Sequence, residues 1–502
     1  MQFFGIALYL GALLLIGVLA SRRMTDLRDY FAAGKDLGFL AVAFSARATG
    51  ESAWLLLGLT GMGAAIGVKA FWVVLGEVLG VAVAWLFMSR RFHRLTSRYD
   101  SVTIPDYLES RFRDQSQNLR RVAALTLVIF VTIYVSAQID ATGSAFESFL
   151  GWNYFVGALV GFAVVMIYTV SGGFLAVVWS DVFQGTLMVI GLAALPAIAL
   201  IHMGGWGEVS ASLATADPNL LSWSGGMGWT ATGIASILGL ALIGLGFLGS
   251  PQIFVRFLAL RDESEISKGT ATAIIWTIVA DSGAVMIGLC GRAILVGSDL
   301  GNGGQDVLPL LVDQLLPAFL VGIYIAIVLS ATMSTVDSLL VVASSAFVRD
   351  YHQQIKNPEL SDQSLLSMSR NTTFILAAIA FAIAIAVAVA VPGRTIFWFV
   401  IFGWSGIAAT FCPTIILSLA WTRFTARGAI AAMLAGFVGV PLFKFGATAL
   451  PGVTGTFFAE LSELPPAFML SFMVGILVSL GDRLGQEKLA DVGDELSAGP
   501  DH

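Results

Sequence analysis

The sequence predicts an all-α polytopic membrane protein with thirteen transmembrane helices, on three observations. The chain has 502 residues, of which 57% are hydrophobic and only 12% charged, whereas a soluble domain carries about 25% charged residues. Its apolar residues form runs that match the roughly 20 residues a helix needs to cross a bilayer. Lys and Arg gather in alternate loops between these runs, which is the pattern of the positive-inside rule.

The apolar runs follow one another along the chain. The first run is followed rather than preceded by Arg22 and Arg23, which is typical of a membrane span with its N-terminus outside and not of a signal peptide. Several later runs are longer than a straight crossing needs, so they can tilt or be interrupted. The predicted spans are 3–20, 37–66, 70–89, 121–149, 154–175, 180–203, 230–257, 270–298, 317–347, 371–391, 396–420, 427–449 and 465–482.

The basic residues set the orientation of these spans. Loops assigned to the inside hold most of the 27 Lys and Arg residues, Arg256 among them, whereas the outer loops hold only Lys69 and Arg394. Thirteen spans that start outside leave the C-terminus inside, so we expect a multi-pass protein of the cell inner (plasma) membrane. The polar end, 483–502, is expected to be a disordered cytoplasmic tail. The basic inner loop near 90–120 contains TIPDYLESRF, which predicts a short surface helix.

The second span, 37–66, carries polar residues at its centre, and ionisable residues inside a membrane mark function. Arg47, Gly50 and Glu51 lie there among hydroxyl side chains, near the midplane. A break in the helix would free backbone carbonyls for a cation. The alternative is an unbroken helix in which Arg47 and Glu51 pair at i, i+4. The clustering of glycine, hydroxyls and charges favours the break.

The seventh span, 230–257, contains the run IGLGFLGSPQ, in which glycines precede Pro251. These glycines could serve close helix packing, but with the proline they favour a second discontinuous helix. The two broken spans begin two groups of five spans, 37–203 and 230–420, of which the first starts inside and the second outside. This arrangement predicts an inverted-topology repeat within one integral membrane domain, with a binding site between the broken helices.

The ninth span, 317–347, groups oxygen-bearing side chains in its interior. They are Ser334, Thr335, Asp337 and Ser338. A single membrane serine usually bonds its own backbone, but four such oxygens together suit a hard cation such as Na⁺. Asp181, at the inner end of the sixth span, is either a further signal of this kind or a helix N-terminal carboxylate.

Other classes of function find little support. Cys290 and Cys412 both lie in apolar runs, which predicts neither a disulfide framework nor a zinc site. The four His residues avoid mid-span positions, so we expect no transition metal and no cofactor. The net charge of −6 offers no basic footprint for nucleic acid. No nucleophile–base pair is visible, so an enzyme is not expected.

Six motifs occur in order along most of the chain. They are DYFAAGKDLG (29–38), SARATGESAWLLLGLTG (45–61), TIPDYLESRF (103–112), GGFLAVVWSDVFQ (172–184), GSPQIFVRFLA (249–259) and ATMSTVDSLLVVASS (331–345). With these motifs the chain resembles the sodium:solute symporter family, and most closely its sodium/proline branch. The resemblance implies the leucine-transporter-type fold of inverted five-helix repeats.

The resemblance also implies which residues bind Na⁺ between the second and ninth spans. The implied ligands are Ala48 and Glu51, through backbone carbonyls, with Ala331, Ser334 and Thr335. Some family members resemble a second-site pattern nearer the cytoplasm. On this chain that pattern falls on Asp181, Ser334, Asp337 and Ser338.

The same resemblance implies a place for the solute. The implied contacts are Ser52, Trp54, Tyr134, Gln138 and Phe247. The chain departs from proline carriers here. It has Gly50 where they have Asp, Glu51 where they have an apolar residue, and Ile243 with Phe247 in place of a Trp-x-x-x-Tyr pair. Gln138 and Asp140 stand where the relatives are apolar or small.

These observations predict a Na⁺-coupled secondary active symporter that imports a small zwitterionic solute by alternating access. Proline or a related amino acid is the first expectation. A rival within transport is proton coupling through Glu51 and Asp140, because desolvation can move a carboxylate into a useful titration range. A rival of another class is a membrane sensor that binds solute without moving it, although no output domain is visible.

Overall fold

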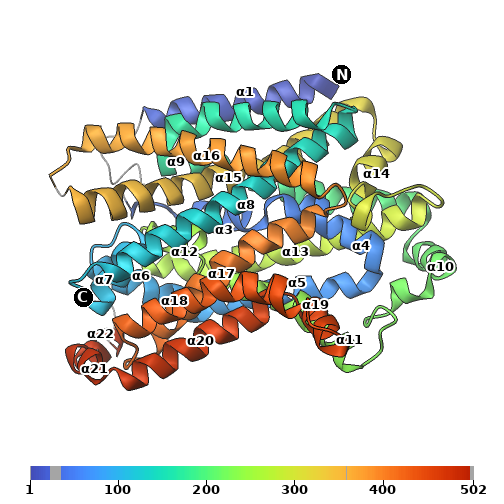
Figure 1. Cartoon of the computed structure of the whole chain (residues 1–502). Helices are drawn as coiled ribbons and strands as arrows, with labels where there is room; N and C mark the ends of the chain where they lie inside the picture. Colours follow the sequence, from blue (N-terminus) through green and yellow to red (C-terminus); the bar gives the residue numbers. More distant parts are fainter. Residues whose placement is uncertain (1, 23–34, 358, 498–502) are drawn as a thin grey trace.

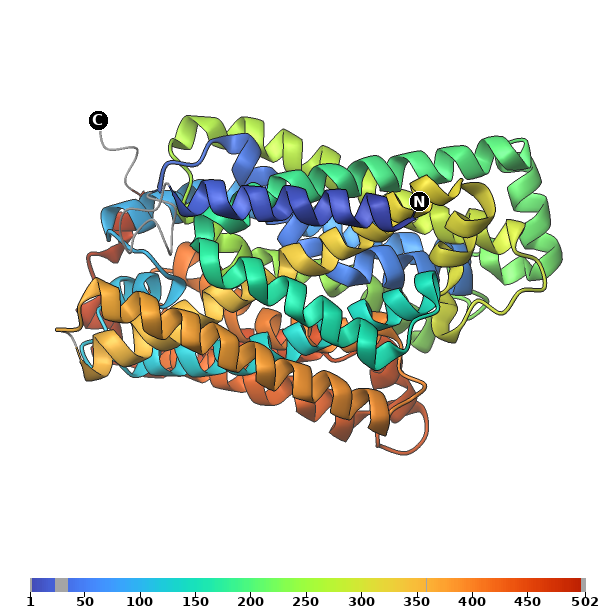
Figure 2. The ribbon, with the colours of Figure 1, turned by 90° about the horizontal axis from the view of Figure 1, so that it is seen from above.

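In this computed structural model the described residues are 2–22, 35–357 and 359–497. Most of its helices run roughly side by side along one direction (Figure 1). The same arrangement is seen from above in Figure 2. The N-terminal end of α1 lies at the end of the bundle that carries α10 and α14, whereas α21 and α22 lie at the opposite end (Figure 1).

The segments that could cross a membrane are all helices. Among the described residues, 11 helical segments are long and apolar enough to cross a membrane, and Tyr154–Val164 is a shorter apolar helix. The protein is therefore an all-helical polytopic membrane protein, which confirms the predicted class. The first half of the chain forms α1 (Gln2–Ser21), α3 (Phe39–Ala53), α4 (Thr60–Ile66), α5 (Phe71–Val83), α6 (Ser89–Arg98), α7 (Ile104–Phe112), α8 (Asn118–Leu150) and α9 (Tyr154–Met203).

The second half contains further long helices and short helices at both ends of the bundle. These are α10 (Trp206–Ala216), α11 (Ala231–Ala241), α12 (Pro251–Leu258), α13 (Ile266–Ile294), α14 (Val307–Leu315), α15 (Ala318–Ser345), α16 (Asp362–Ala390), α17 (Ile396–Ala420), α18 (Ala426–Pro441), α19 (Val453–Leu461), α20 (Leu464–Gly481), α21 (Arg483–Lys488) and α22 (Val492–Ser497). The chain between α15 and α16 continues as a π-helical stretch, Ala346–Lys356.

Burial separates central from peripheral helices. The most apolar windows of α15 and α17 are 83% and 89% buried, whereas those of α1 and α16 are only 28% buried. Exposed Phe and Leu side chains cover the outer faces of these two peripheral helices, where a bilayer would meet them. The polar residues predicted on 317–347 therefore sit on one of the most enclosed helices of the molecule.

Helix α9 covers 50 residues and contains two helices that meet at a kink, within the predicted span 154–175 and before the predicted span 180–203. The kink lies at Gly173, where φ is 55° and ψ is −166°. A positive φ with this ψ is open to glycine and costly for other residues. The bend lies eight residues before Asp181 in the chain. The direction of the helix after the bend therefore sets how the Asp181 carboxylate enters the bundle.

Helix α7 confirms the helix predicted for TIPDYLESRF. Its N-cap is Thr103, whose hydroxyl accepts a hydrogen bond from the Asp106 backbone N–H, with Pro105 in the first turn. The helix is buried rather than on the surface, because its apolar face packs into the end of the bundle and its acidic residue pairs inward. Arg120 Nη1 lies 2.6 Å from Asp106 Oδ1, and Arg349 Nη2 lies 3.1 Å from Asp106 Oδ2. Burial alone would raise the pKa of Asp106, but the two guanidinium groups outweigh it and lower the pKa of that carboxyl.

The C-terminal segment corrects a prediction. The sequence predicted disorder over 483–502, but residues 483–488 and 492–497 form the short helices α21 and α22. Arg113 explains the order, because its guanidinium lies 2.7 Å from Asp491 Oδ2 and 2.9 Å from Glu495 Oε1.

Parts of some predictions lie outside the described residues. They are the inner-loop residues Arg23 and Arg28, the stretch 29–34 of the first motif, and the last part of the tail, 498–502.

Candidate functional site

The break predicted in the second span lies at Ser52. Its backbone has φ 47° and ψ −167°, inside a helix that is otherwise regular from Phe39 to Ala53. Trp54–Leu59 then continue as a π-helical stretch before α4. A positive φ on a non-glycine residue costs free energy of order 1–3 kcal/mol, so such a conformation persists only where the surroundings hold it. The predicted interruption is confirmed, at the last residue of its polar centre.

Helix α15 packs its hydroxyls against this part of α3. The Ser334 hydroxyl donates to the Ala48 carbonyl at 3.0 Å, and the Thr335 hydroxyl donates to the Thr49 carbonyl at 3.0 Å. Each hydroxyl also lies 3.3 Å from the Ala331 carbonyl. These five residues are buried, so carbonyl and hydroxyl oxygens from two helices meet in one enclosed place. Four of the five residues predicted to bind Na⁺ are brought together here. The fifth, Glu51, is predicted to bind through its backbone carbonyl, and its side chain pairs with Arg47.

The predicted second site contains a residue that the sequence reading had placed in a loop. Arg256, on α12, is fully buried, and its Nη2 lies 3.0 Å from Asp181 Oδ2. The same nitrogen donates to the Thr49 hydroxyl at 2.7 Å and to the Ser338 hydroxyl at 2.5 Å. The assignment of Arg256 to an inner loop is therefore wrong, because α12 packs against α3 and carries its guanidinium into the bundle. Asp181 also accepts a hydrogen bond from Ser45 at 2.6 Å.

Asp337 makes a more local contact. One of its oxygens accepts the Ser338 backbone N–H at 2.6 Å, while Oδ2 has no hydrogen-bond partner. Asp181 Oδ1 is also without a partner. The structure thus joins Asp181 and Ser338 through Arg256 and leaves one free oxygen on each of the two aspartates.

The residues predicted to contact solute gather around the break at Ser52. The Ser52 hydroxyl lies 3.4 Å from the Tyr134 hydroxyl and accepts a hydrogen bond from Gln138 Nε2 at 3.3 Å. Gln138 Oε1 accepts the Ala53 backbone N–H at 2.9 Å, which satisfies a backbone group freed near the break. Trp54 turns back along its own helix, and its indole N–H donates to the Gly50 carbonyl at 3.3 Å.

Aromatic rings close one side of this polar group. The Phe247 ring centroid lies 5.0 Å from that of Trp404, and the Trp404 ring lies 6.3 Å from that of Tyr134. Phe247 comes from the 3₁₀-helical stretch Leu242–Leu248 between α11 and α12, which confirms the second broken helix. Trp404 was missed, because a lone tryptophan in an apolar span carries no signal.

Two departures from proline carriers are coupled in space. A Cβ built on Gly50 would lie 2.8 Å from Phe247 Cε1, so a larger residue at position 50 would collide with this ring. The ring also covers the guanidinium of Arg47, whose Cζ is 4.6 Å from the ring centroid. Gly50 therefore leaves room for the Phe247 ring to lie against α3 and over Arg47.

Arg47 and Glu51 form the ion pair that helical spacing predicted. The pair is completely enclosed, and two further carboxylates lie beside it, Glu77 on α5 and Asp281 on α13. Arg47 Nη2 is 3.9 Å from Glu77 Oε2. Sequence reasoning missed both carboxylates, although a single acidic residue inside an apolar run is the same kind of signal that drew attention to Glu51.

Asp140 belongs to a different group of residues. It forms an ion pair with Arg394, and it accepts a hydrogen bond from the Tyr154 hydroxyl at 2.6 Å. The structure therefore does not bring Asp140 together with Glu51, and the proposed proton route through these two residues has no common site in this structure.

Comparison with known proteins agrees with this geometry. Residues 30–436 match the sodium:solute symporter family. The high-affinity proline transporter PutP of Bacillus subtilis is 33% identical over 487 residues, which cover 97% of this chain and 100% of the relative. The sodium/proline symporter of Escherichia coli is 31% identical over 478 residues, which cover 94% of this chain and 91% of the relative.

Solved structures agree with the fold. A Na⁺-coupled sialic acid symporter, solved in a substrate-bound outward-open state, superposes with a TM-score of 0.78 at 19% identity, over 95% of this chain and 97% of that one. MhsT in complex with L-phenylalanine gives a TM-score of 0.53 at 19% identity, over 88% of this chain and 98% of that one. The fold is similar to that of leucine-transporter-type transporters. The chain therefore belongs to the sodium:solute symporter family, as a multi-pass membrane transporter rather than an enzyme, with Na⁺ and a small solute as its substrates.

Proposed function

We propose that this protein imports proline or a related small zwitterionic amino acid together with Na⁺, by alternating access. Support for the solute comes from the two relatives named as proline transporters, which are 33% and 31% identical over nearly the whole chain. Support for the coupling ion comes from the oxygens gathered between α3 and α15.

The contact between α3 and α15 carries the proposal. We propose that Na⁺ binds to the carbonyls of Ala48 and Glu51, the carbonyl of Ala331 and the hydroxyls of Ser334 and Thr335. The two hydroxyls already lie against the carbonyls of α3 at 3.0 Å, so the oxygens that a hard cation prefers are preassembled there. Na⁺ would link the two helices and so favour one state of the transport cycle.

A second Na⁺ site is proposed at Asp181, Ser334, Asp337 and Ser338. The unpartnered oxygens of the two aspartates support it. Arg256 touches both Asp181 and Ser338, so a bound cation there would share two ligands with its guanidinium.

The solute is proposed to bind beside the break in α3. Ser52 and Gln138 supply hydroxyl and amide groups for the ammonium and carboxylate of a zwitterion, and Tyr134 adds a phenol. Phe247 supplies an apolar face for a pyrrolidine ring or a small side chain, and Trp54 lies across the break. This set places polar groups on one side of a small ligand and aromatic carbon on the other.

We infer thirteen spans, with the N-terminus outside and the C-terminus inside. The helical run Phe39–Arg98 has 60 residues and contains two predicted spans on either side of a turn at Gly67, and Tyr154–Val164 belongs to the predicted fifth span. The first inverted repeat is 37–203, and the second is 230–420. Their first helices, α3 and the α11–α12 pair, are both interrupted, which supports the pairing.

The test is uptake of labelled amino acids into proteoliposomes that contain the purified full-length chain. We expect proline to accumulate when Na⁺ is present outside, and to accumulate little when choline replaces Na⁺. Liposomes without protein are the control. Equal uptake in both media that collapses with a protonophore would reject Na⁺ coupling, whereas Na⁺-dependent uptake of another amino acid alone would reject proline only.

A first prediction concerns the Na⁺ ligands. Thr335→Ala and Ser334→Ala should each raise the Na⁺ concentration for half-maximal uptake roughly tenfold, because losing one oxygen ligand costs about 1.4 kcal/mol. The matched control is Thr332→Ala on the same helix, since the Thr332 hydroxyl donates to the Leu329 carbonyl at 2.9 Å and faces no ligand of the proposed site. Unchanged Na⁺ dependence in both ligand variants would reject the assignment.

A further inference from the structure

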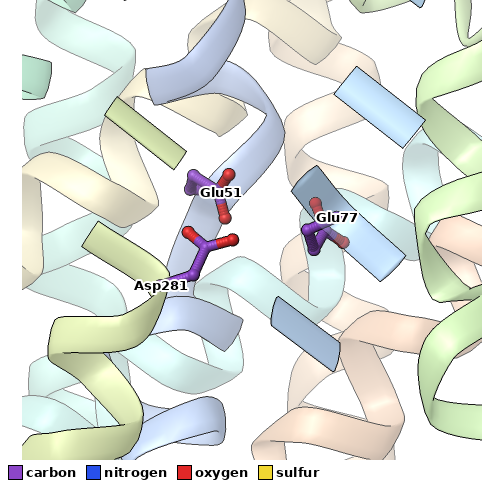
Figure 3. Close-up of side chains that lie close together, drawn as sticks. All are labelled: Glu51, Glu77 and Asp281. Carbon is purple, nitrogen blue, oxygen red and sulfur yellow. The ribbon is translucent and has the colours of Figure 1, made fainter. Parts of the chain in front are cut away.

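Three acidic side chains from three helices converge in the membrane-buried part of the bundle. Glu51 comes from α3, Glu77 from α5 and Asp281 from α13, and one carboxylate oxygen of each lies within 4.8 Å of the others. None of the three is more than 1% exposed. Figure 3 shows Glu51 and Asp281 facing each other, with Glu77 beside them on the neighbouring helix.

Asp281 and Glu77 have few hydrogen-bond partners. Both oxygens of Asp281 and Oε2 of Glu77 have none. Arg47 is the cation beside them, paired with Glu51 and 3.9 Å from Glu77. Its guanidinium is held by two rings, with Cζ 4.6 Å from the Phe247 centroid and 5.6 Å from that of Trp276.

The charges within this group do not balance. Three carboxylates and one guanidinium carry a formal charge of −2, enclosed among α3, α5 and α13. An unpaired buried charge costs several kcal/mol even after the protein relaxes around it. An additional positive charge would remove part of this cost, and the unpartnered oxygens show where it would bind.

The oxygens of the three carboxylates lie close enough together to share one hard cation. Oxygens that face each other across a hard cation are separated by about twice the metal–oxygen distance of roughly 2.3–2.6 Å. One carboxylate oxygen of each residue lies within 4.8 Å of the others, so a single cation can contact all three.

We propose that Glu51, Glu77 and Asp281 form an additional cation site that binds a hard cation of sodium size, with Na⁺ as the occupant. The site is separate from the contact of α3 with α15, because it uses the Glu51 carboxylate rather than the backbone carbonyls of that helix. A bound Na⁺ would reduce the formal charge of the group from −2 to −1 and would tie α5 and α13 to the broken helix. The proposal does not depend on the identity of the solute or on the ligands assigned at Ser334 and Thr335.

The experiment counts bound Na⁺ on the purified full-length chain in nanodiscs by equilibrium binding of ²²Na⁺. Asp281→Asn and Glu77→Gln should each lose one Na⁺ per chain relative to the unchanged protein. Thr335→Ala should lose a different Na⁺, so the double variant Asp281→Asn with Thr335→Ala should lose two. The matched control is Glu463→Gln, because Glu463 is also a buried carboxylate but is already paired with Lys444 at 3.2 Å.

Two results would overturn the proposal. One is an unchanged Na⁺ count in both cluster variants when gel filtration shows them to be folded. The other needs no cluster variant at all, and so remains decisive if they fail to fold. It is a complete loss of Na⁺ binding in Thr335→Ala, because the carboxylate site should still bind Na⁺ in that variant.

Two further arms identify the occupant. Competition with Ca²⁺ should displace the cluster's Na⁺ only weakly, since Arg47 lies against the site; displacement by micromolar Ca²⁺ would overturn the assignment to Na⁺. Proton release into an unbuffered medium on adding Na⁺, absent in Asp281→Asn, would show that a proton occupies the cluster beforehand. If the unchanged protein releases protons in this way but Asp281→Asn binds as many Na⁺ ions as the unchanged protein, the cluster is a proton site and not a Na⁺ site.

Discussion

Two buried ionic groups in this protein differ in how well they are satisfied. At the end of the bundle near α7, the guanidinium groups of Arg120 and Arg349 face the buried Asp106 and Asp350. Arg120 also pairs with the partly exposed Glu109 at 3.3 Å, so two positive charges meet three negative charges. The Thr103 hydroxyl adds a hydrogen bond to Asp350 at 2.9 Å. In the middle of the bundle, one guanidinium faces three carboxylates, and Asp281 accepts no hydrogen bond at all.

The difference separates a structural group from a candidate binding site. A group whose charges nearly balance and are mostly hydrogen-bonded holds helices together and offers a ligand little. An unbalanced group with unpartnered oxygens is costly on its own, so its retention in the chain points to an occupant. On this reasoning, the group at α7 has a structural role, and the group at Arg47 is the one for which we propose a bound cation.

The largest effect is expected at Arg47. Among the described residues, Arg47 is the cation that contacts these carboxylates, so Arg47→Ala should destabilise the folded protein by about 3–5 kcal/mol, with loss of uptake. Glu51→Gln should also cripple uptake. Thermal unfolding in detergent, together with uptake per folded molecule, measures both effects.

The double variant tests the pairing directly. Arg47→Ala combined with Glu51→Gln should recover part of the stability lost in Arg47→Ala, because it removes the stranded carboxylate along with its partner. Additive losses in this double-mutant cycle would show that the two residues do not interact energetically.

A somewhat smaller loss of stability is expected at the balanced group. Arg120→Ala should cost about 3 kcal/mol, because it leaves Asp106 and Asp350 with fewer partners. The Na⁺ concentration for half-maximal uptake should be unchanged in the folded fraction. A clear shift in that Na⁺ concentration would contradict the assignment of a purely structural role to the group at α7.

Asp181 is an intermediate case, since one oxygen pairs with Arg256 and the other has no partner. Asp181→Asn keeps the shape of the side chain and should lower uptake more than it lowers stability. Uptake at each Na⁺ concentration, compared with the unfolding temperature, provides the measurement. Normal Na⁺ stoichiometry in this variant would make Asp181 a structural partner of Arg256 only.

The smallest effect is a pH dependence at the α7 group. The pKa of Asp106 is lowered in the folded protein because the neighbouring Arg349 and Arg120 outweigh its burial. Its contribution to stability is therefore complete above the unfolded pKa of about 3.9 and is lost as pH falls through the folded value. Asp106→Asn should be less stable at neutral pH and should lose less further stability between about pH 5 and 3. Parallel stability curves would contradict this account.

The sequence predicted the features that interrupt an otherwise apolar helical span. The polar centre of 37–66 and the glycine run before Pro251 are departures from an apolar helix, and both broken helices are present. The hydroxyls of α15 were visible for the same reason, and two of them meet the carbonyls of α3. Motif order then placed these segments in one family.

Features that depend on contacts between distant segments were not predicted. Glu77 and Asp281 are single acidic residues in separate spans, and only the packing of α13 against both α3 and α5 brings them beside Arg47. Arg256 ends an apolar run, where a charge normally indicates a loop, yet it is buried. The helix α22 owes its order to Arg113, which lies 378 positions away from Asp491 in the chain.

Shielded thiols give the chain a practical property. Cys290 and Cys412 are both fully buried, and the Cys412 thiol donates to the Gly246 carbonyl at 3.3 Å. Water-soluble maleimides should therefore react slowly with the native protein, so cysteines introduced at exposed positions can be labelled without first removing the native ones. Val453 and Val296 are 74% and 72% exposed and suit a pair of spin labels. Distance distributions between such labels, recorded with and without Na⁺, would follow the opening and closing of the bundle in a chain that keeps its own core.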